Sequence, residues 1–270
     1  MVIKHRQSYI PYHVQRAIYF TLHAMNTVSN RFPSQDLEAV IAEQCLRALG
    51  RPEKATFFQR FFKAGPGQYG EGDQFLGLTV PEVRTLAKRF FGLPITECVK
   101  LLQSPYNETR LLALLILVAR YKKADAAEKQ QVYNTYLANR ARVNNWNLVD
   151  SSAPYIVGDY LGDKDRAILA DLAKSDVLWD RRIAVLATFA FIRNNDFRDA
   201  LSLSAQLLND PQDLMHKACG WMLREVGKRD AQALEHFLRQ HQRSMPRTML
   251  RYAIERYPPE VRSVVMSGTF

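Results

Sequence analysis

The chain is poor in cysteine and lacks the local signatures of common metal and nucleophile sites. Its 270 residues include three cysteines, none of them in a CxxC pair, which argues against a disulfide framework and against a thiolate zinc site. The histidines are scattered, and neither HExxH nor a GxSxG nucleophile elbow occurs. We therefore expect chemistry without metal or cofactor, in a reducing compartment. The cysteines are Cys45, Cys98 and Cys219.

Long hydrophobic runs and early acidic residues are also missing. No segment approaches the roughly 18 consecutive apolar residues that read as a membrane span, and AIYFTLHAM near the N-terminus is short and interrupted by His23. We expect a soluble protein that does not enter a membrane. No acidic residue precedes Asp36, so residues 1–35 form a basic N-terminal extension. Its role, as an arm, a transit-like leader or an extra helix, is left open by the sequence.

What the chain has in excess is positive charge. Lys and Arg number 37 against 27 Asp and Glu, which gives a net charge of +10. Such a balance suits a polyanionic partner, and nucleic acid is the first candidate. A protein that is merely basic would have the same composition, so the charge alone does not decide.

Apolar residues recur at helical spacing from Asp36 onward, while no period-2 run of strand length occurs. Short breaks separate segments of one or two helices, at a spacing of about 40 residues that is typical of HEAT and armadillo repeats. The sequence therefore predicts one all-α, HEAT-like or armadillo-like solenoid domain over residues 36–270, with a concave basic groove. A globular helical bundle is the alternative. The breaks include Gly92-Leu-Pro94, Ser104-Pro105, Gly162-Asp163, Asn194-Asn195-Asp196, Asp210-Pro211 and Tyr257-Pro-Pro259.

Residues 64–77, AGPGQYGEGDQFLG, form a Gly-rich stretch that resembles a phosphate loop only superficially. It lacks the terminal GK[ST] of a Walker A motif and the GxGxxG register, so we expect a loop that does not bind a nucleotide. Its glycines could serve a tight turn or let backbone amides reach a phosphate. VPEVRTLAKRF follows, with Pro81 near a helix start and with Arg84, Lys88 and Arg89 at spacings that share a face. This face is either a solvated surface or a contact with a DNA backbone.

In NNWNLVD, Trp146 and Asp150 are four residues apart. On a helix this spacing puts the indole and the carboxylate one turn apart on the same face. The alternative is a core tryptophan followed by an aspartate that caps the next helix, since Asp150 precedes Ser-Ser-Ala-Pro. The functional interpretation places the carboxylate of Asp150 beside a sugar of a bound DNA strand.

Arg181 and Arg182 open an otherwise apolar helix in LWDRRIAVLATFAFIR. One of them could pair with Asp180 or Asp176. An arginine that leaves a buried helix into a groove is also a good phosphate clamp, because its fork donates two hydrogen bonds.

KACGWMLREVGKRD repeats this theme, with Arg224 and Lys228 one turn apart after Trp221. Further arginines follow every four residues, although Pro246 must break the helix between them. Each cation alone is typical of a solvated surface, whereas the series predicts a track for phosphates. The later members are Arg239, Arg243, Arg247 and Arg251.

Five blocks of this sequence, in order, resemble those of the HEAT-like-repeat alkylpurine DNA glycosylases of the AlkD type, a family of DNA alkylation repair proteins. The resemblance runs from about Asp36 to about Tyr257, and residues 1–35 lie outside it. The blocks are FFKAGPGQYGEGDQFLG, NNWNLVDSSAP, LWDRRIAVLATFAFIR, HKACGWMLREVGKRD and MPRTMLRYAIER.

The resemblance implies a monofunctional, metal-independent glycosylase that hydrolyses the N-glycosidic bond of cationic N3- or N7-alkylated purines in duplex DNA, without base flipping. It implies that Trp146 and Asp150 are the active-site tryptophan and aspartate, that Arg182 is the active-site arginine, and that Trp221 is the second tryptophan of the cleft. Tyr69 is the candidate for a further cleft aromatic, although the Gly-rich loop departs from the better-known members.

Two other classes of function share this pattern. A non-catalytic HEAT-repeat protein could bind distorted or branched DNA, but a pure binder gains nothing from a carboxylate such as Asp150, which repels phosphates. A HEAT-type protein scaffold would lack the steep salt dependence that phosphate contacts impose. We expect a monomer in the bacterial cytoplasm, associated with the nucleoid, with double-stranded DNA and no obligate protein as its partner.

Overall fold

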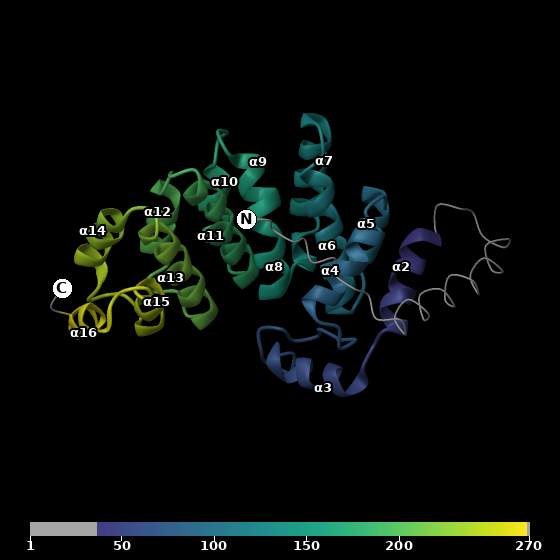
Figure 1. The fold of residues 1–270 in the computed structure, drawn as a ribbon, viewed down its shortest axis with the longest axis horizontal. Helices are drawn as coiled ribbons and strands as arrows, with labels where there is room; N and C mark the ends of the chain where they lie inside the picture. Colours follow the sequence, from purple (N-terminus) through teal and green to yellow (C-terminus); the bar gives the residue numbers. More distant parts are fainter. Residues whose placement is uncertain (1–36, 269–270) are drawn as a thin grey trace, which may run out of the picture. The chain divides into compact units, whose positions relative to one another are not determined.

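The computed structural model describes residues 37–268, which are folded almost entirely as helices (Figure 1). Within this range there is no β-strand, only an isolated parallel bridge between Gln74 and Tyr106. The all-α class is therefore confirmed. The basic N-terminal extension predicted over residues 1–35 lies outside the described residues. The chain divides into two compact units, Met1–Ile116 and Leu117–Phe270, so the single domain predicted over residues 36–270 stays a prediction.

The described part of the first unit consists of short helices around a Gly-rich loop. The carboxylate of Glu108 accepts hydrogen bonds from the backbone N–H groups of Leu76, Gly77 and Leu78, at 3.0, 2.9 and 3.2 Å. Gly77 has φ 87°, in the left-handed region that favours glycine. The loop predicted from composition is thus tied to the helix that begins at Asn107. The helices are α2 (Leu37–Ala48), α3 (Pro52–Phe61), α4 (Val80–Arg89), α5 (Ile95–Leu102) and α6 (Asn107–Tyr121), in which the boundary between the units falls.

In the second unit, successive helices pack as a repeating series. Figure 1 shows α11, α13 and α15 side by side in one row, with α10, α12 and α14 in a second row; each helix of the first row contacts the next. This is the stacking expected of a helical-repeat fold. The helices are α7 (Ala126–Ala138), α8 (Trp146–Ala153), α9 (Asp159–Leu161), α10 (Ala167–Ala173), α11 (Leu178–Arg193), α12 (Arg198–Gln206), α13 (Asp213–Gly227), α14 (Ala231–His241), α15 (Arg247–Ala253) and α16 (Pro259–Ser267).

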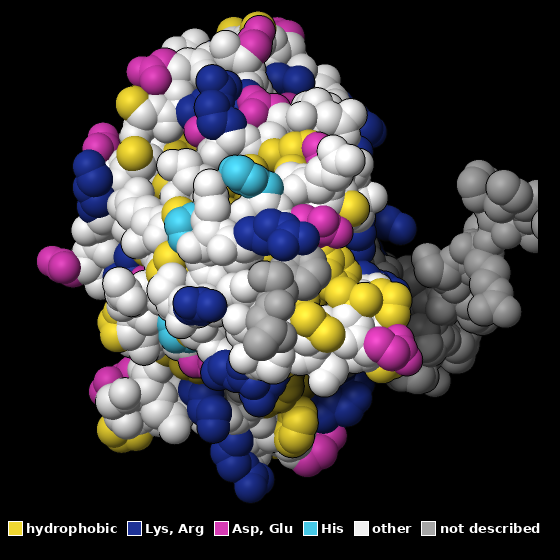
Figure 2. Space-filling view, turned by 90° about the vertical axis from the view of Figure 1, so that its left-hand side faces the viewer, with side chains coloured by type: hydrophobic (Ala, Val, Ile, Leu, Met, Phe, Trp, Pro, Cys, Tyr) yellow, Lys and Arg dark blue, Asp and Glu magenta, His cyan; other side chains and the backbone are white. Residues whose placement is uncertain are grey.

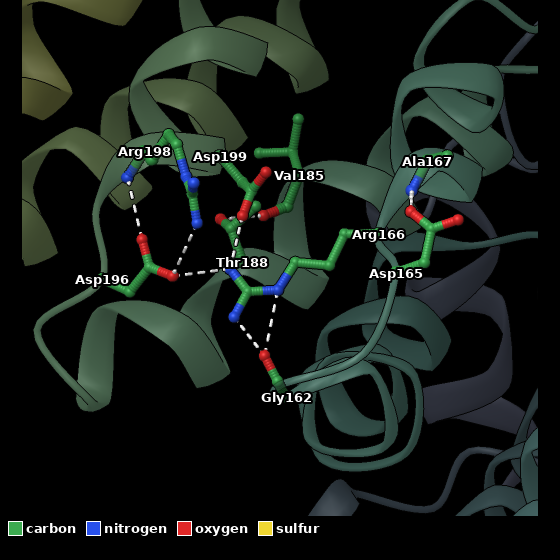
Figure 3. A network of polar contacts seen from close by, with 9 residues as sticks. All are labelled: Gly162, Asp165, Arg166, Ala167, Val185, Thr188, Asp196, Arg198 and Asp199. Atoms are coloured by element: carbon green, nitrogen blue, oxygen red, sulfur yellow. Dashed lines mark hydrogen bonds and ion pairs between the residues drawn. The ribbon is translucent and has the colours of Figure 1, made fainter.

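A charged network joins two turns of the second row (Figure 3). Arg166, before α10, donates to the carboxylates of Asp196 and Asp199 at 2.7 and 2.6 Å and to the carbonyl of Gly162. Its guanidinium also lies 3.7 Å from the ring centroid of Phe191. Ion pairs of this kind fix the turns that hold α10 and α12 against α11.

Candidate functional site

Trp146 and Asp150 lie on α8, one turn apart and both half-buried, as the sequence predicts. Asn145 stands at the N-cap, where its side chain accepts a hydrogen bond from the backbone N–H of Trp146. The alternative in which Asp150 caps a following helix is wrong, because α8 continues to Ala153 and passes directly into a further helical turn. The carboxylate therefore lies at mid-helix, one turn after the indole.

Arg182 brings α11 into contact with this carboxylate. Its Nε and Nη2 donate to the two oxygens of Asp150, both at 2.8 Å, and its Nη1 donates to the carbonyl of Leu214 at 2.7 Å. The Arg182 side chain is 5% exposed and that of Asp150 is 19% exposed. In this pair the cation is buried and the carboxylate reaches the surface. The guanidinium fork predicted to clamp a phosphate holds Asp150 here, so its phosphate contact stays a prediction.

The neighbouring Arg181 makes a separate pair. Its Nε donates to Asp210, in the turn before α13, at 2.6 Å. The sequence-based suggestion that one arginine pairs with the carboxylate of Asp180 or Asp176 is wrong, because Arg181 contacts only the backbone carbonyl of Asp176. The Asp180 carboxylate instead lies 3.2 Å from Nε of Arg140. Adjacent residues of a helix point in different directions, so partners from other elements are favoured over sequence neighbours.

The back of α8 is supported by a buried hydroxyl pair. The hydroxyl groups of Tyr136 and Ser152 lie 3.1 Å apart, and Ser152 also donates to the carbonyl of Leu148 at 2.6 Å. Burial raises the pKa of the Tyr136 phenol, and the nearby charge of Asp150 adds to the effect. Tyr136 therefore stays neutral and anchors the helix that carries Asp150.

A π-turn follows directly after this helix. The segment Pro154–Gly158 is a π-helix that leads into α9. Pro154 has no N–H for the carbonyl of residue 150, and a proline ring crowds the carbonyl four residues before it, so the helix widens here. Gly158 lets this turn approach α11 closely, since a Cβ there would lie 2.1 Å from the carbonyl oxygen of Ala187. Sequence reasoning expected a helix boundary at Pro154 and missed the continuation.

The exposed edge of this helical run is shifted by the π-turn. Trp146, Asp150 and Tyr155 are half-buried, and Asp159 is exposed, while Pro154 and Gly158 are buried. A regular α-helix would have continued the edge from Asp150 through residues 154 and 158. The extra residue of the π-turn therefore brings Tyr155 into line with the tryptophan and the carboxylate.

Trp221 lies on α13, the next helix in the same row. Its Nε1 donates to Glu225 at 3.1 Å, and its ring is tilted against Phe189 of α11 with 6.1 Å between the centroids. The indole is half-buried. Because α11 packs on both α8 and α13, the four predicted site residues lie on three helices of one unit that are joined through α11.

The cations that follow Trp221 are paired with acids that sequence reasoning did not consider. Lys228 lies 2.7 Å from Glu225, and Arg224 forms ion pairs with Glu225 and Glu255. Glu225 thus neutralises part of the predicted track while it orients the Trp221 indole. Its position next to Arg224 and four residues after Trp221 was the available signal.

The later part of the track runs from α14 to α15 and is exposed. Figure 2 shows Lys and Arg side chains gathered along the lower part of the C-terminal end of the molecule. Arg247 donates to the carbonyl of Met266 at 2.5 Å, and Arg251 lines a hollow of about 260 Å³ together with Arg262. Pro246 separates α14 from α15, as predicted.

The remaining predicted residues belong to the first unit. Arg84 and Lys88 are exposed on α4, and Tyr69 is half-buried in the Gly-rich loop. Helix α4 begins as expected, with Pro81 in its first turn and a capping box formed by Thr79 and Glu82. Arg84 and Lys88 are accessible to a ligand, and the role of all three residues stays a prediction.

Residues 37–268 contain no group of three or more His, Cys, Asp and Glu side chains that could hold a metal ion. Across the same range, none of the helices has the length and apolarity to traverse a bilayer. The three cysteines are buried and free, and burial raises the pKa of the Cys219 thiol to about 12. Asp150, by contrast, presents a partly exposed carboxylate at this site.

Comparisons with known proteins bear on the fold and on the family of the chain. The structure is similar to a solved structure of a predicted DNA alkylation repair enzyme from Enterococcus faecalis, with a TM-score of 0.62 and 16% identity, over 78% of this chain and 97% of that chain. At this identity the likeness shows the fold alone. A search of the curated proteins finds no match. The family model described as DNA alkylation repair enzyme matches residues 42–257, and the chain belongs to that family.

Proposed function

We propose that this protein is a monofunctional DNA glycosylase that releases cationic N3- or N7-alkylated purines from duplex DNA, without a metal ion or cofactor. One observation carries the proposal: an accessible carboxylate, Asp150, is fixed on both oxygens by the buried Arg182 and lies one helical turn from Trp146. Membership in the DNA alkylation repair enzyme family supports DNA as the partner.

The leaving group needs little activation by the enzyme. An alkylated purine already carries a positive charge, so the electron pair of the C1′–N bond neutralises it on departure and no general acid is required. The difficult species is the oxocarbenium-like sugar that remains. An anion placed beside such a sugar stabilises the transition state, as carboxylates do in other glycoside hydrolyses.

Asp150 has the properties that this role requires. Its carboxylate can stabilise the sugar cation and accept a proton from the water molecule that forms the new C1′–O bond. Both of its oxygens also accept hydrogen bonds from Arg182, which fixes their direction. Arg182 is accordingly a positioning residue, and preorganised charge of this kind needs no rearrangement during the reaction.

The two tryptophans extend this stabilisation. A cation over an indole face gains about 0.5–2 kcal/mol, depending on how far water is excluded. Trp146 and Trp221 would pack on the deoxyribose, while exposed cations such as Arg247 and Arg251 contact phosphates. A site that holds the backbone in this way can act without flipping the base, which relaxes the limit on the size of the adduct.

The test is release of free base from duplex DNA that carries one N7-methylguanine, measured in single turnover at saturating protein. We expect Asp150→Asn, which keeps the shape and removes the charge, to lower the rate by about 100-fold or more. The exposed Asp171→Asn on α10 makes the same change away from the site and should leave the rate unaltered.

Unchanged excision by Asp150→Asn would refute the role of the carboxylate. Absence of excision by every variant, together with salt-sensitive binding to DNA, would instead favour a non-catalytic protein that binds distorted or branched DNA. Absence of both would favour a protein scaffold. Circular dichroism and DNA affinity of each variant separate these results from misfolding.

A further inference from the structure

A second hollow, separate from the pair of Asp150 and Arg182, lies in the same unit. It has a volume of about 510 Å³ and opens between the end of α6, helix α7, the π-turn and the ends of α11 and α13. Four cations and a single carboxylate line it, so its charge is strongly positive. These residues are Lys122, Lys129, Arg193, Arg229 and Asp159.

The cations of this hollow are only weakly engaged by the protein itself. Among the described residues, their only ion pair joins Lys129 to Asp159 at 3.9 Å. Lys122 lies 5.0 Å from the ring centroid of Tyr155, and Arg229 contacts the side-chain oxygen of Asn195 at 3.3 Å. Arg224 and Lys228, by contrast, are tied to glutamates. The hollow therefore retains charge for an external anion.

Stabilisation of helix ends is the structural alternative. Arg193 is the last residue of α11, Lys122 follows α6 and Arg229 follows α13, and cations favour the C-terminal ends of helices by about 0.3–1 kcal/mol. This accounts for single cations near single ends. It does not account for their convergence, with Tyr155, on one open hollow.

The hollow is in line with the catalytic carboxylate. The exposed edge of the helical run passes from Trp146 through Asp150 to Tyr155 and Asp159, because the π-turn shifts its register. Tyr155 and Asp159, which line the hollow, lie five and nine residues beyond Asp150. At about 1.5 Å of rise per residue this is roughly 7–14 Å. We take the duplex axis to run parallel to this helical run. A DNA strand then advances about 3.4 Å per nucleotide, so the separation corresponds to roughly two to four nucleotides.

We propose that this hollow binds one backbone phosphate of the damaged duplex, two to four nucleotides from the nucleotide at Asp150. Lys122 and Arg193 supply charge-assisted hydrogen bonds, and the Tyr155 hydroxyl adds a neutral donor. The contact sets the distance between the strand and the carboxylate, and the π-turn sets its alignment. The assignment of register rests on the proposed function, since it takes the lesion to lie at Asp150.

The first test compares the salt dependence of binding to an undamaged duplex. We expect the double variant Lys122→Gln/Arg193→Gln to bind about tenfold more weakly at low salt and to lower the slope of log Kd against log salt by about one. Lys174→Gln/Arg198→Gln, which removes one exposed cation that follows α10 and one at the start of α12, is the matched control. An affinity equal to that of the wild type, or an equal loss in both double variants, would overturn the proposal.

The second test locates the phosphate. A duplex with one tetrahydrofuran abasic-site analogue fixes the register and has no base to excise, and single phosphates are replaced in turn by neutral methylphosphonates. The wild type should lose about tenfold in affinity at one position, two to four nucleotides from the analogue. The pocket variant should lose nothing further there. If the affinity lost through the methylphosphonate and the affinity lost through the pocket variant add in full at that position, the assignment is contradicted.

These measurements also separate the new site from the proposed function. Binding is read without excision, so an inactive protein with an intact methylphosphonate signal would retain the phosphate site and lose the glycosylase. Normal excision by the wild type, together with no loss of DNA affinity in the pocket variant, would support the glycosylase and refute the phosphate site. A lower melting temperature of that variant without loss of DNA affinity would assign the cations to the helix ends.

Discussion

Two adjacent arginines of α11 form two ion pairs of opposite design. Arg181 binds Asp210, whose side chain is 2% exposed while that of the arginine is 11% exposed. Arg182 binds Asp150, and there the arginine is 5% exposed and the carboxylate 19% exposed. The first pair buries its anion and the second presents it. The same residue types, one position apart, thus produce a structural link and a candidate reactive group.

The difference follows from what surrounds each carboxylate. Asp210 also accepts the backbone N–H of Gln212 at 2.8 Å, which uses it to close the turn before α13. Asp150 stands on the exposed edge of α8, where the two bonds from Arg182 leave the rest of the carboxylate open. A carboxylate that closes a turn stabilises the fold, whereas one held at an open edge can act on a ligand.

We expect the largest effect on stability from a substitution that breaks the ion pair between Arg181 and Asp210. Asp210→Asn leaves Arg181 with an uncompensated buried charge, so we expect a loss of about 3–5 kcal/mol in the free energy of unfolding. The rate of excision by the folded protein should stay within about twofold. Urea denaturation measures the first quantity. Labelling of the Cys219 thiol, which burial and nearby Asp210 hold at a raised pKa, reports local opening. If Asp210→Asn lowered the rate of excision as much as Asp150→Asn, the pair of Arg181 and Asp210 could not be called purely structural.

A smaller effect is expected from substitutions of the two arginines themselves, which compares Arg182 with Arg181. Lysine keeps the charge and loses the fork, so Arg182→Lys should hold Asp150 poorly and lower the single-turnover rate by about 10- to 100-fold. DNA affinity should change little, because the buried guanidinium is directed at Asp150 and Leu214. Arg181→Lys is the control, with an effect on melting temperature and none on rate. A loss of affinity with an unchanged rate in Arg182→Lys would support the phosphate clamp instead.

The next effect concerns the tryptophans. Phenylalanine has a smaller and less electron-rich face, so Trp146→Phe should cost about 1 kcal/mol at the transition state, or roughly fivefold in rate. Trp179→Phe alters a buried indole on α11, so it should lower stability and leave the rate unchanged. Single-turnover kinetics and thermal melts together distinguish a stabilising face from packing. Equal rates in the wild type and Trp146→Phe would remove Trp146 from the site.

The smallest effect tests whether pairing with acids matters among the cations. Arg251→Gln should lower the slope of log Kd against log salt by about one, as expected for a free phosphate contact. Lys228→Gln should lower it by less, because Lys228 is already engaged by Glu225. The slopes come from fluorescence anisotropy on one undamaged duplex. Equal slopes for the two variants would show that the glutamate releases its cation on binding.

Local features were predictable where they depend on short-range pattern. The helical periodicity gave the all-α class, and the predicted breaks at Gly162, Asn194–Asp196 and Asp210 fall between helices. Trp146 and Asp150 share a face because their spacing equals one helical turn. Prediction failed at Pro154, where the proline favoured a boundary but packing of Gly158 on α11 keeps the chain helical as a π-turn.

Ion pairs between residues far apart in the chain could not be predicted from the sequence. Nothing local shows that Arg182 meets Asp150, 32 residues away, or that Glu255 neutralises Arg224. Each pairing depends on which helix face is turned toward which neighbour, and that is fixed by the packing of whole helices. The sequence by itself determined the helices, the positive charge and the residue types of the site. Tertiary structure alone decided which carboxylate is exposed and where cations converge, because burial and pairing are properties of elements brought together from distant parts of the chain.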